Sequence, residues 1–307
     1  MKLLLTMLFA PILLSGLPFT RAAAEPDLPA AIYTDPPYDP AHPASGQGIQ
    51  FQSHGAVINA QLYQPPGAGA HPTVILLHGL PGNEQNLDLA QAIRRAGWTV
   101  ITFHYRGSWG SGGKYRLVNG VGDAEALLAL LDQPEKAAAW GVDPSRTVLI
   151  GHSYGGYVAA RVASDAPKLL GVALLAPWDV SFNERTWAQL PLARRQSVGV
   201  AAFFDVDGRL SGANARSIFD EVMKEGTRLD LTGCAPGLIG RQLLIVTATR
   251  DDEGDKATGL LAALHEAHAQ HLTAELMDTD HGFNDHRIAL ESVVLRWLVG
   301  LAPASKL

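Results

Sequence analysis

The chain has little cysteine and little clustered positive charge. Cys234 is the only cysteine among 307 residues, so no intrachain disulfide can form and the fold must depend on its core. The net charge is −6 and no block of lysine and arginine occurs, which disfavours binding to nucleic acid or to anionic membranes. Charged residues make up 18% of the chain and hydrophobic residues 47%, which predicts a large packed core rather than disorder.

Hydrophobic runs long enough to cross a membrane are also missing. The most apolar stretch, residues 3–14, follows one lysine and is shorter than the roughly 20 apolar residues that span a bilayer. Small residues at Ala22 and Ala24 come next, which completes the order of a secretory signal peptide. We therefore expect residues 1–24 to be a signal peptide, Glu25 to begin the mature chain, and the protein to be secreted or periplasmic without a stable membrane anchor.

Patterns that could suggest a cation site are weak. Residues 205–208 (Asp-Val-Asp-Gly) resemble part of a calcium loop, but that register puts a phenylalanine and an asparagine where the first and last acidic ligands are needed. His265, His268 and His271 have helical spacing without a strong carboxylate partner, which favours a solvated helix face. We expect no metal site and no organic cofactor.

The order of apolar and polar segments predicts an α/β fold. Residues 25–48 are rich in proline, alanine, aspartate and glycine and are expected to form an extended N-terminal arm, and the alternation that follows to residue 64 indicates antiparallel strands. Beyond residue 73, short apolar runs alternate with helical stretches, as in a mostly parallel sheet covered by helices on both faces. The expected strands are 73–77, 98–103, 147–150, 171–175, 242–247 and 273–277, and the expected helices are 84–96, 123–140, 154–164 and 285–300.

The stretch 179–240 breaks this alternation. It lies between two expected strands, holds two helix-like segments and contains no clear core strand. We interpret it as a lid inserted over the carboxyl edge of the sheet, where such folds place their sites. Four aromatic residues in or directly before this stretch have two possible roles, as the lining of an apolar acyl pocket under the lid or as the core of the lid: Trp178, Trp187, Phe203 and Phe204.

A candidate nucleophile lies in the sequence Gly151-His152-Ser153-Tyr154-Gly155. This G-x-S-x-G pattern follows an apolar strand and precedes a helix, which is the context that the motif requires. A sharp strand-to-helix turn would lift Ser153 above the sheet edge in a strained conformation. Glycine is needed at 151 and 155 because side chains there would collide with the neighbouring strand and helix. The pattern predicts that Ser153 is a catalytic nucleophile.

Four segments together resemble the α/β-hydrolase superfamily over roughly residues 50 to 300: residues 78–82 (HGLPG), 105–111 (YRGSWGS), 151–156 (GHSYGG) and 280–283 (DHGF). Within it the pattern is similar to dienelactone-hydrolase-like enzymes and to the catalytic domains of prolyl-oligopeptidase and acylaminoacyl-peptidase relatives. The resemblance implies an α/β-hydrolase domain over residues 49–307 with an inserted lid.

The chain order in this fold is serine, acid, histidine. His281 follows the last expected strand and would serve as the general base, whereas His286 is expected inside the final helix. Asp251 stands where similar enzymes carry the triad aspartate, three residues after a usual glycine that is Ala248 here. That departure leaves Asp252 as the alternative acid, whose role would be to orient the base and stabilise its charged form.

Acyl transfer also needs fixed N–H donors for the developing oxyanion. One is the backbone N–H of Tyr154, the residue after the nucleophile. The other should come from the loop that begins at His78, whose imidazole is expected to fix the loop. Pro81 has no N–H, so Leu80 is the expected donor, with Gly79 second.

These residues predict a serine hydrolase that cleaves a carboxylic ester through an acyl-enzyme on Ser153. A peptidase or amidase of the same fold is the alternative, although the chain is too short to carry also the propeller of the prolyl-oligopeptidase enzymes. A non-catalytic binding protein on a hydrolase scaffold is a third possibility, which the intact serine, histidine and aspartate disfavour. The expected partner is a small-molecule ester or a short peptide.

Overall fold

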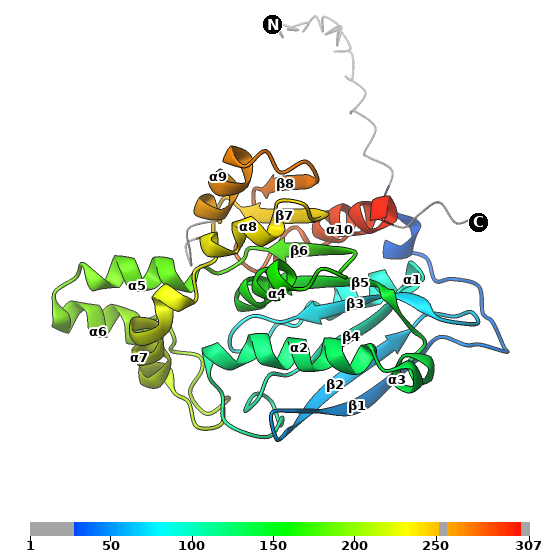
Figure 1. The fold of residues 1–307 in the computed structure, drawn as a ribbon, viewed down its shortest axis with the longest axis horizontal. Coiled ribbons are helices and arrows are strands. Elements are labelled where there is room, and N and C mark those ends of the chain that lie inside the picture. The colour runs from blue at the N-terminus through cyan, green and yellow to red at the C-terminus, as the bar shows by residue number, and fades with distance from the viewer. Residues whose placement is uncertain (1–27, 252–256, 302–307) are drawn as a thin grey trace, which may run out of the picture.

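The computed structural model describes residues 28–251 and 257–301. The expected signal peptide and the alternative acid Asp252 lie outside these residues. Eight strands form one sheet in the order β1-β2-β4-β3-β5-β6-β7-β8 (Figure 1). The strands are β1 (Ser45–Ser53), β2 (Ala56–Gln64), β3 (His71–Leu77), β4 (Thr99–Phe103), β5 (Val142–His152), β6 (Gly171–Leu175), β7 (Leu243–Ala248) and β8 (Leu272–Met277).

The sheet is mostly parallel, as the sequence predicts. Strands β1 and β2 form an antiparallel hairpin, β2 runs antiparallel to β4, and all pairs from β4 to β8 are parallel. The arm predicted for 25–48 is too long by four residues, because β1 begins at Ser45 and pairs with Gln64. Residues 45–48 are polar or glycine and exposed, so nothing in their hydropathy indicates the strand.

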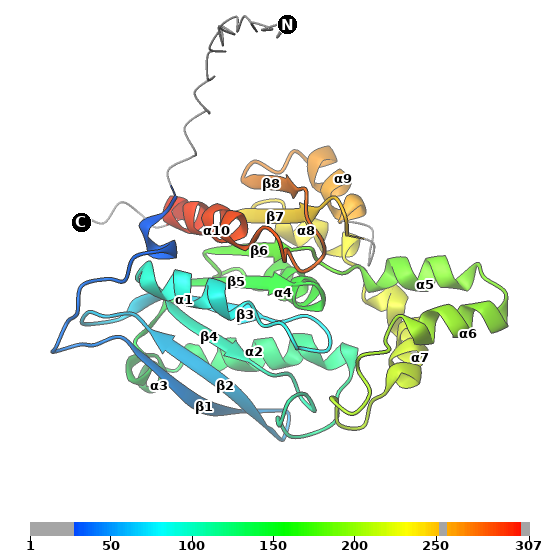
Figure 2. The same ribbon diagram turned by 180° about the vertical axis from the view of Figure 1, so that it is seen from behind.

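Helices cover both faces of the sheet (Figures 1 and 2). The alternation of β3 explains the two layers, because Val74 and Leu76 face one core while Ile75 and Leu77 face the other. The first core includes α1 and α10, and the second includes α2, α4 and α9. The bounds of these helices are α1 (Leu87–Arg95), α2 (Gly120–Leu131), α4 (Tyr154–Asp165), α9 (Thr258–Glu266) and α10 (Arg287–Leu301).

Some predicted bounds are wrong for local reasons. The helix predicted over 123–140 is two helices, α2 and α3 (Pro134–Ala139), because Pro134 cannot continue a helix but suits the first position of a new one. The helix predicted from residue 84 begins at Leu87, after Asn86 in a left-handed conformation. His268 and His271 lie beyond the end of α9, so the three histidines do not share a helix face.

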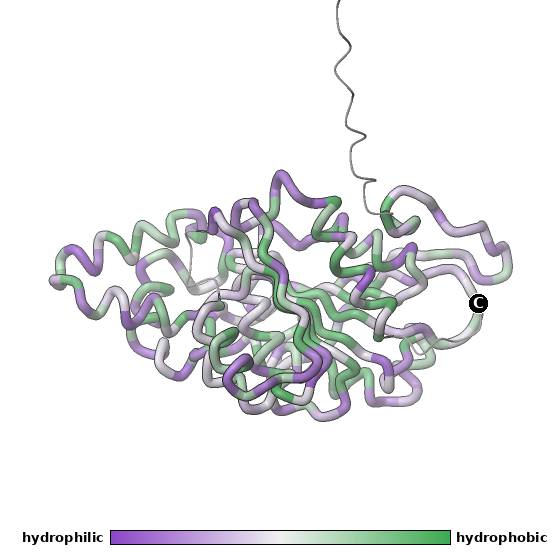
Figure 3. The backbone as a smooth tube through the Cα atoms, turned by 90° about the horizontal axis from the view of Figure 1, so that it is seen from above, coloured by the Kyte–Doolittle hydropathy of each residue, from purple (hydrophilic) through white to green (hydrophobic). Residues whose placement is uncertain are grey.

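The segment between β6 and β7 is helical. It contains α5 (Val180–Ala188), α6 (Leu192–Ala201), α7 (Ala215–Glu225) and α8 (Ala235–Leu238). Helices α5 to α7 project from one side of the sheet, and we call residues 180–225 the cap (Figure 1). Seen from above, hydrophilic and hydrophobic residues alternate along the cap helices, whereas the central strands are largely hydrophobic (Figure 3). Within the described residues, no helix is long and apolar enough to cross a membrane.

Candidate active site

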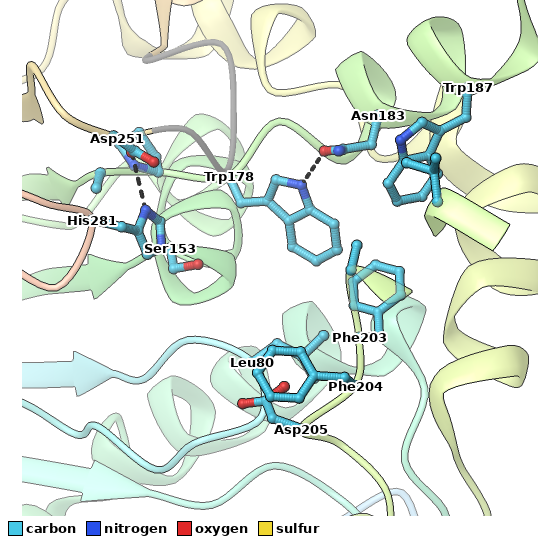
Figure 4. A pocket seen from close by; sticks show the side chains of 14 residues that line it. Leu80, Ser153, Trp178, Asn183, Trp187, Phe203, Phe204, Asp205, Asp251 and His281 are labelled. Atoms are coloured by element: carbon cyan, nitrogen blue, oxygen red, sulfur yellow. Dashed lines mark hydrogen bonds and ion pairs between the residues drawn. The ribbon is translucent and has the colours of Figure 1, made fainter. Parts of the chain in front are cut away.

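The carboxyl ends of the parallel strands bring the predicted site residues together. Ser153 follows β5, His281 follows β8, Asp251 follows β7, and Leu80 lies in the loop after β3. Because these strands are parallel, all four residues lie at the same edge of the sheet. Figure 4 shows Ser153, His281 and Asp251 side by side.

Ser153 has a backbone conformation that non-glycine residues rarely adopt. Its φ is 56° and its ψ is −120°, at the turn between β5 and α4. Such a conformation costs on the order of 1–3 kcal/mol and persists only when its surroundings fix it. Here the Ser153 N–H donates to the carbonyl of Leu175 at 2.9 Å, and the Trp178 N–H donates to the Ser153 carbonyl at 2.9 Å. The end of β6 therefore holds the serine in place.

The flanking glycines make this turn possible. A Cβ at Gly151 would lie 2.0 Å from the carbonyl oxygen of Gly155, and a Cβ at Gly155 would lie 2.2 Å from that of Leu77. Both contacts are with backbone, which cannot move aside without separating α4 from β5 or from the end of β3. The prediction that glycine is needed at both positions is confirmed by this geometry.

Asp251 and His281 form a hydrogen bond between Nδ1 and Oδ2 at 3.0 Å. The two residues meet because the pairing of β7 with β8 continues past the strands, with the Thr249 N–H donating to the Met277 carbonyl at 2.8 Å. Asp251 is nearly buried, with its side chain 4% exposed. His286 lies just before α10 instead of inside it, and its Nδ1 is 3.1 Å from Asp285.

The loop that carries His281 is anchored on both sides. Arg287 donates to the carbonyl of Gly282 at 3.1 Å and pairs with Asp88 of α1 at 2.6 Å. On the other side, His152 Nε2 lies 2.9 Å from the His281 carbonyl oxygen, which can only accept, so Nε2 carries the proton. These contacts position the imidazole of His281 from its backbone.

His152 is neutral for a physical reason. It is buried, and desolvation together with the neighbouring His281 lowers its pKa to about 3. The neutral His152 ring, whose centroid lies 4.9 Å from that of His281, therefore places no positive charge beside His281. This residue occupies the variable position of the G-x-S-x-G pattern, so the motif gave no signal of its role.

The predicted oxyanion donors lie close to Ser153. Tyr154 is the first residue of α4, where an N–H has no acceptor within its own helix. On the opposite loop, a Cβ at Gly79 would lie 2.9 Å from the Ser153 Cβ, so the backbone that leads into Leu80 passes directly beside the serine. The Gly79–Leu80 peptide therefore runs along the side chain of Ser153.

His78 fixes the orientation of that peptide. Its Nδ1 lies 2.7 Å from the Gly79 carbonyl oxygen, and burial lowers its pKa to about 3, so a neutral ring donates this hydrogen bond. In a trans peptide the C=O of Gly79 and the N–H of Leu80 point in opposite directions. Holding the carbonyl on one side therefore aims the Leu80 N–H to the other.

A cavity of about 580 Å³ opens above Ser153 beneath the cap, and we call it the cap cavity (Figure 4). Its lining contains all four aromatic residues that the sequence singled out: Trp178, Trp187, Phe203 and Phe204. The first three are buried, and the ring centroid of Phe203 lies 5.9 Å from that of Trp178 and 5.9 Å from that of Trp187, whereas Phe204 is 81% exposed. Three of these residues thus line the cavity and also pack together in the core, whereas their role in binding an acyl group stays a prediction.

A second cavity of about 350 Å³, the polar cavity, shares Ser153, His281, Leu80 and Asp205 with the first. It lies between the Leu80 loop and the His281 loop, and its wall is mostly polar. Both cavities thus border Ser153. Across residues 28–251 and 257–301, no group of three or more histidine, cysteine, aspartate or glutamate side chains is arranged to hold a metal ion.

Similarity to known proteins agrees with this geometry. The model of the alpha/beta hydrolase family matches residues 74–291. A quorum-quenching protein, AidA of Acinetobacter baumannii, is 28% identical over 177 residues, which are 56% of each chain. The chain thus spans less than two thirds of the length of the curated relatives it matches.

Solved structures share the fold at low identity. The acylaminoacyl peptidase of Pyrococcus horikoshii superposes with a TM-score of 0.62 at 14% identity, over 83% of this chain and 41% of that one. The carboxylesterase EstE1 from a metagenomic library gives a TM-score of 0.60 at 19% identity, over 85% and 91% of the two chains. At these identities the likeness shows the fold alone.

Proposed function

The chain belongs to the alpha/beta hydrolase family, and on that premise we propose that it is a serine esterase that cleaves carboxylic esters through an acyl-enzyme on Ser153. One observation carries the proposal. A serine on a strained turn lies beside His281, whose Nδ1 is hydrogen-bonded to the buried carboxylate of Asp251 at 3.0 Å. This is the arrangement that activates a hydroxyl as a nucleophile.

The chemistry takes two steps. His281 removes the proton of Ser153 as Oγ attacks the ester carbonyl, and the N–H groups of Leu80 and Tyr154 stabilise the oxyanion. Asp251 stabilises the imidazolium, which then gives its proton to the departing alcohol. Water, deprotonated by His281, releases the acid from Ser153 and restores the enzyme.

The two cavities favour a particular orientation of the substrate. The leaving alcohol must lie near His281 to receive its proton. The polar cavity is lined by four residues of the His281 loop, Asp280, His281, Gly282 and Asn284, whereas the cap cavity is lined by His281 alone among these. We therefore assign the leaving group to the polar cavity and the acyl group to the aromatic cap cavity.

Turnover of p-nitrophenyl esters by wild type and by Ser153→Ala tests the proposal. Loss of a triad serine should lower kcat by several orders of magnitude, up to about 10⁶-fold. Ser164→Ala, at the other end of α4, is the matched control and should retain the wild-type rate. Turnover of p-nitroanilides in preference to esters would favour the amidase alternative, and equal activity of Ser153→Ala and wild type would overturn the proposal.

A further inference from the structure

Asn183 is a polar residue in an otherwise apolar part of the cap cavity. It lies on α5, and the other cap residues in the wall are apolar except Asp205. Asp205 lies at the border with the polar cavity, where Asn83 and Arg209 each approach its Oδ2 to 3.5 Å. Asn183 instead lies on the far side of Trp178 from the nucleophile (Figure 4).

The orientation of the Asn183 amide is fixed by its neighbour. The indole N–H of Trp178 can only donate a hydrogen bond, and it lies 2.6 Å from the amide oxygen of Asn183. Trp178 is itself buried, and its backbone N–H is bound to the Ser153 carbonyl. The amide oxygen is therefore occupied, and the two protons of the amide nitrogen remain available. No acceptor for this nitrogen is found among residues 28–251 and 257–301.

We propose that Asn183 is a specificity-determining residue that donates a hydrogen bond to an oxygen carried by the acyl group of the substrate. The preferred substrates are then esters of acids whose apolar chain bears a ketone or hydroxyl oxygen. The inference rests on the proposed function, which places the acyl group in the cap cavity. The aromatic walls of the cap cavity bind the apolar part of the acyl chain, and the amide of Asn183 donates a hydrogen bond to its oxygen.

The physical reason is desolvation. Asn183 is half-buried, so in the free enzyme water can accept from its amide. A plain alkyl chain displaces that water and leaves the N–H unpaired in an apolar pocket, which is unfavourable, whereas a chain with a well-placed oxygen replaces it. A site built in this way rejects the analogue that lacks the partner group. The effect of one such unpaired group corresponds to about tenfold in kcat/KM.

The experiment compares kcat/KM for p-nitrophenyl octanoate with that for its oxo analogues, in which the ketone occupies each inner carbon in turn. The readout is the ratio of the best oxo ester to the plain ester, because a ratio cancels general losses of activity. In wild type we expect kcat/KM to be about tenfold higher for the best oxo ester than for the plain ester. Asn183→Leu should bring the ratio to about one. Gln189→Leu, an exposed residue at the end of the same helix, should keep the wild-type ratio.

Asn183→Asp is a second variant that separates loss of the donor from a disturbed pocket. It keeps an oxygen for the Trp178 indole N–H but replaces the N–H donor by an acceptor. Its ratio should fall below one for ketones, since the carboxylate repels a carbonyl oxygen. A ratio near one in wild type, or a wild-type ratio in Asn183→Leu, would overturn the inference and leave the esterase proposal intact. If the wild type hydrolyses none of these esters, the proposed function is overturned and this inference with it.

Discussion

Replacing Asp251 by asparagine is a sharp test of the triad geometry. The carboxylate can only accept the proton of His281 Nδ1, at 3.0 Å, and so keeps Nε2 free to take the proton of Ser153. An amide can also donate, and in that orientation it moves the imidazole proton to Nε2, where the base is blocked. Because Asp251 is nearly buried, water cannot replace the lost charge. We expect kcat to fall about 10⁴-fold, equivalent to about 5 kcal/mol of transition-state stabilisation.

The assay is the steady-state hydrolysis of p-nitrophenyl acetate by Asp251→Asn, with thermal unfolding measured in parallel to show that the isosteric variant folds. Asp252→Asn, the neighbouring acid that the sequence left as an alternative, is the control and should retain more than a tenth of wild-type kcat. The reverse outcome, with Asp251→Asn active and Asp252→Asn inactive, would refute the assignment of the acid.

Three further outcomes follow from the structure. Gly155→Ala should destabilise the protein by about 1–3 kcal/mol in urea unfolding and abolish turnover, because its Cβ would lie 2.2 Å from a backbone oxygen, whereas Gly48→Ala meets nothing within 4 Å and should behave as wild type. Burial lowers the pKa values of His78 and His152 to about 3. Between about pH 6.5 and about pH 3 these histidines are therefore protonated in the unfolded chain and neutral in the folded chain. Stability measured by urea unfolding should therefore fall with decreasing pH across that window, by up to about 1.4 kcal/mol per pH unit for each histidine, and His78→Asn should show a shallower slope. We also propose that the protein is exported with cleavage before Glu25, so N-terminal sequencing of the secreted or periplasmic form should begin there, and an intact cytoplasmic chain would contradict this.

The fold and the turn that carries Ser153 could be predicted because their signals are local. An apolar run followed by Gly151 and Gly155 around Ser153 describes a strand, a tight turn and a helix in one short segment. Asp251 and His281 could then be placed because each follows a strand of the same parallel sheet. The contact between them depends on the register of β7 with β8, which the sequence does not encode locally.

The rest of the site depends on contacts between distant segments. Asn183 gives no signal in the sequence, because its role arises from the indole of Trp178 and from the cavity that the cap encloses. The hydrogen bond from His152 to the backbone of His281 joins residues that are far apart in the chain. The division of the predicted helix over 123–140 was visible in Pro134, a signal that hydropathy alone conceals.

The most direct test of the central claim is mass spectrometry of the protein after treatment with a fluorophosphonate, which forms a stable adduct with an activated serine. We predict one adduct per chain, on the peptide that contains Ser153, and no adduct in Ser153→Ala. Folded wild-type protein that remains unlabelled, or that is labelled at another serine, would contradict the account.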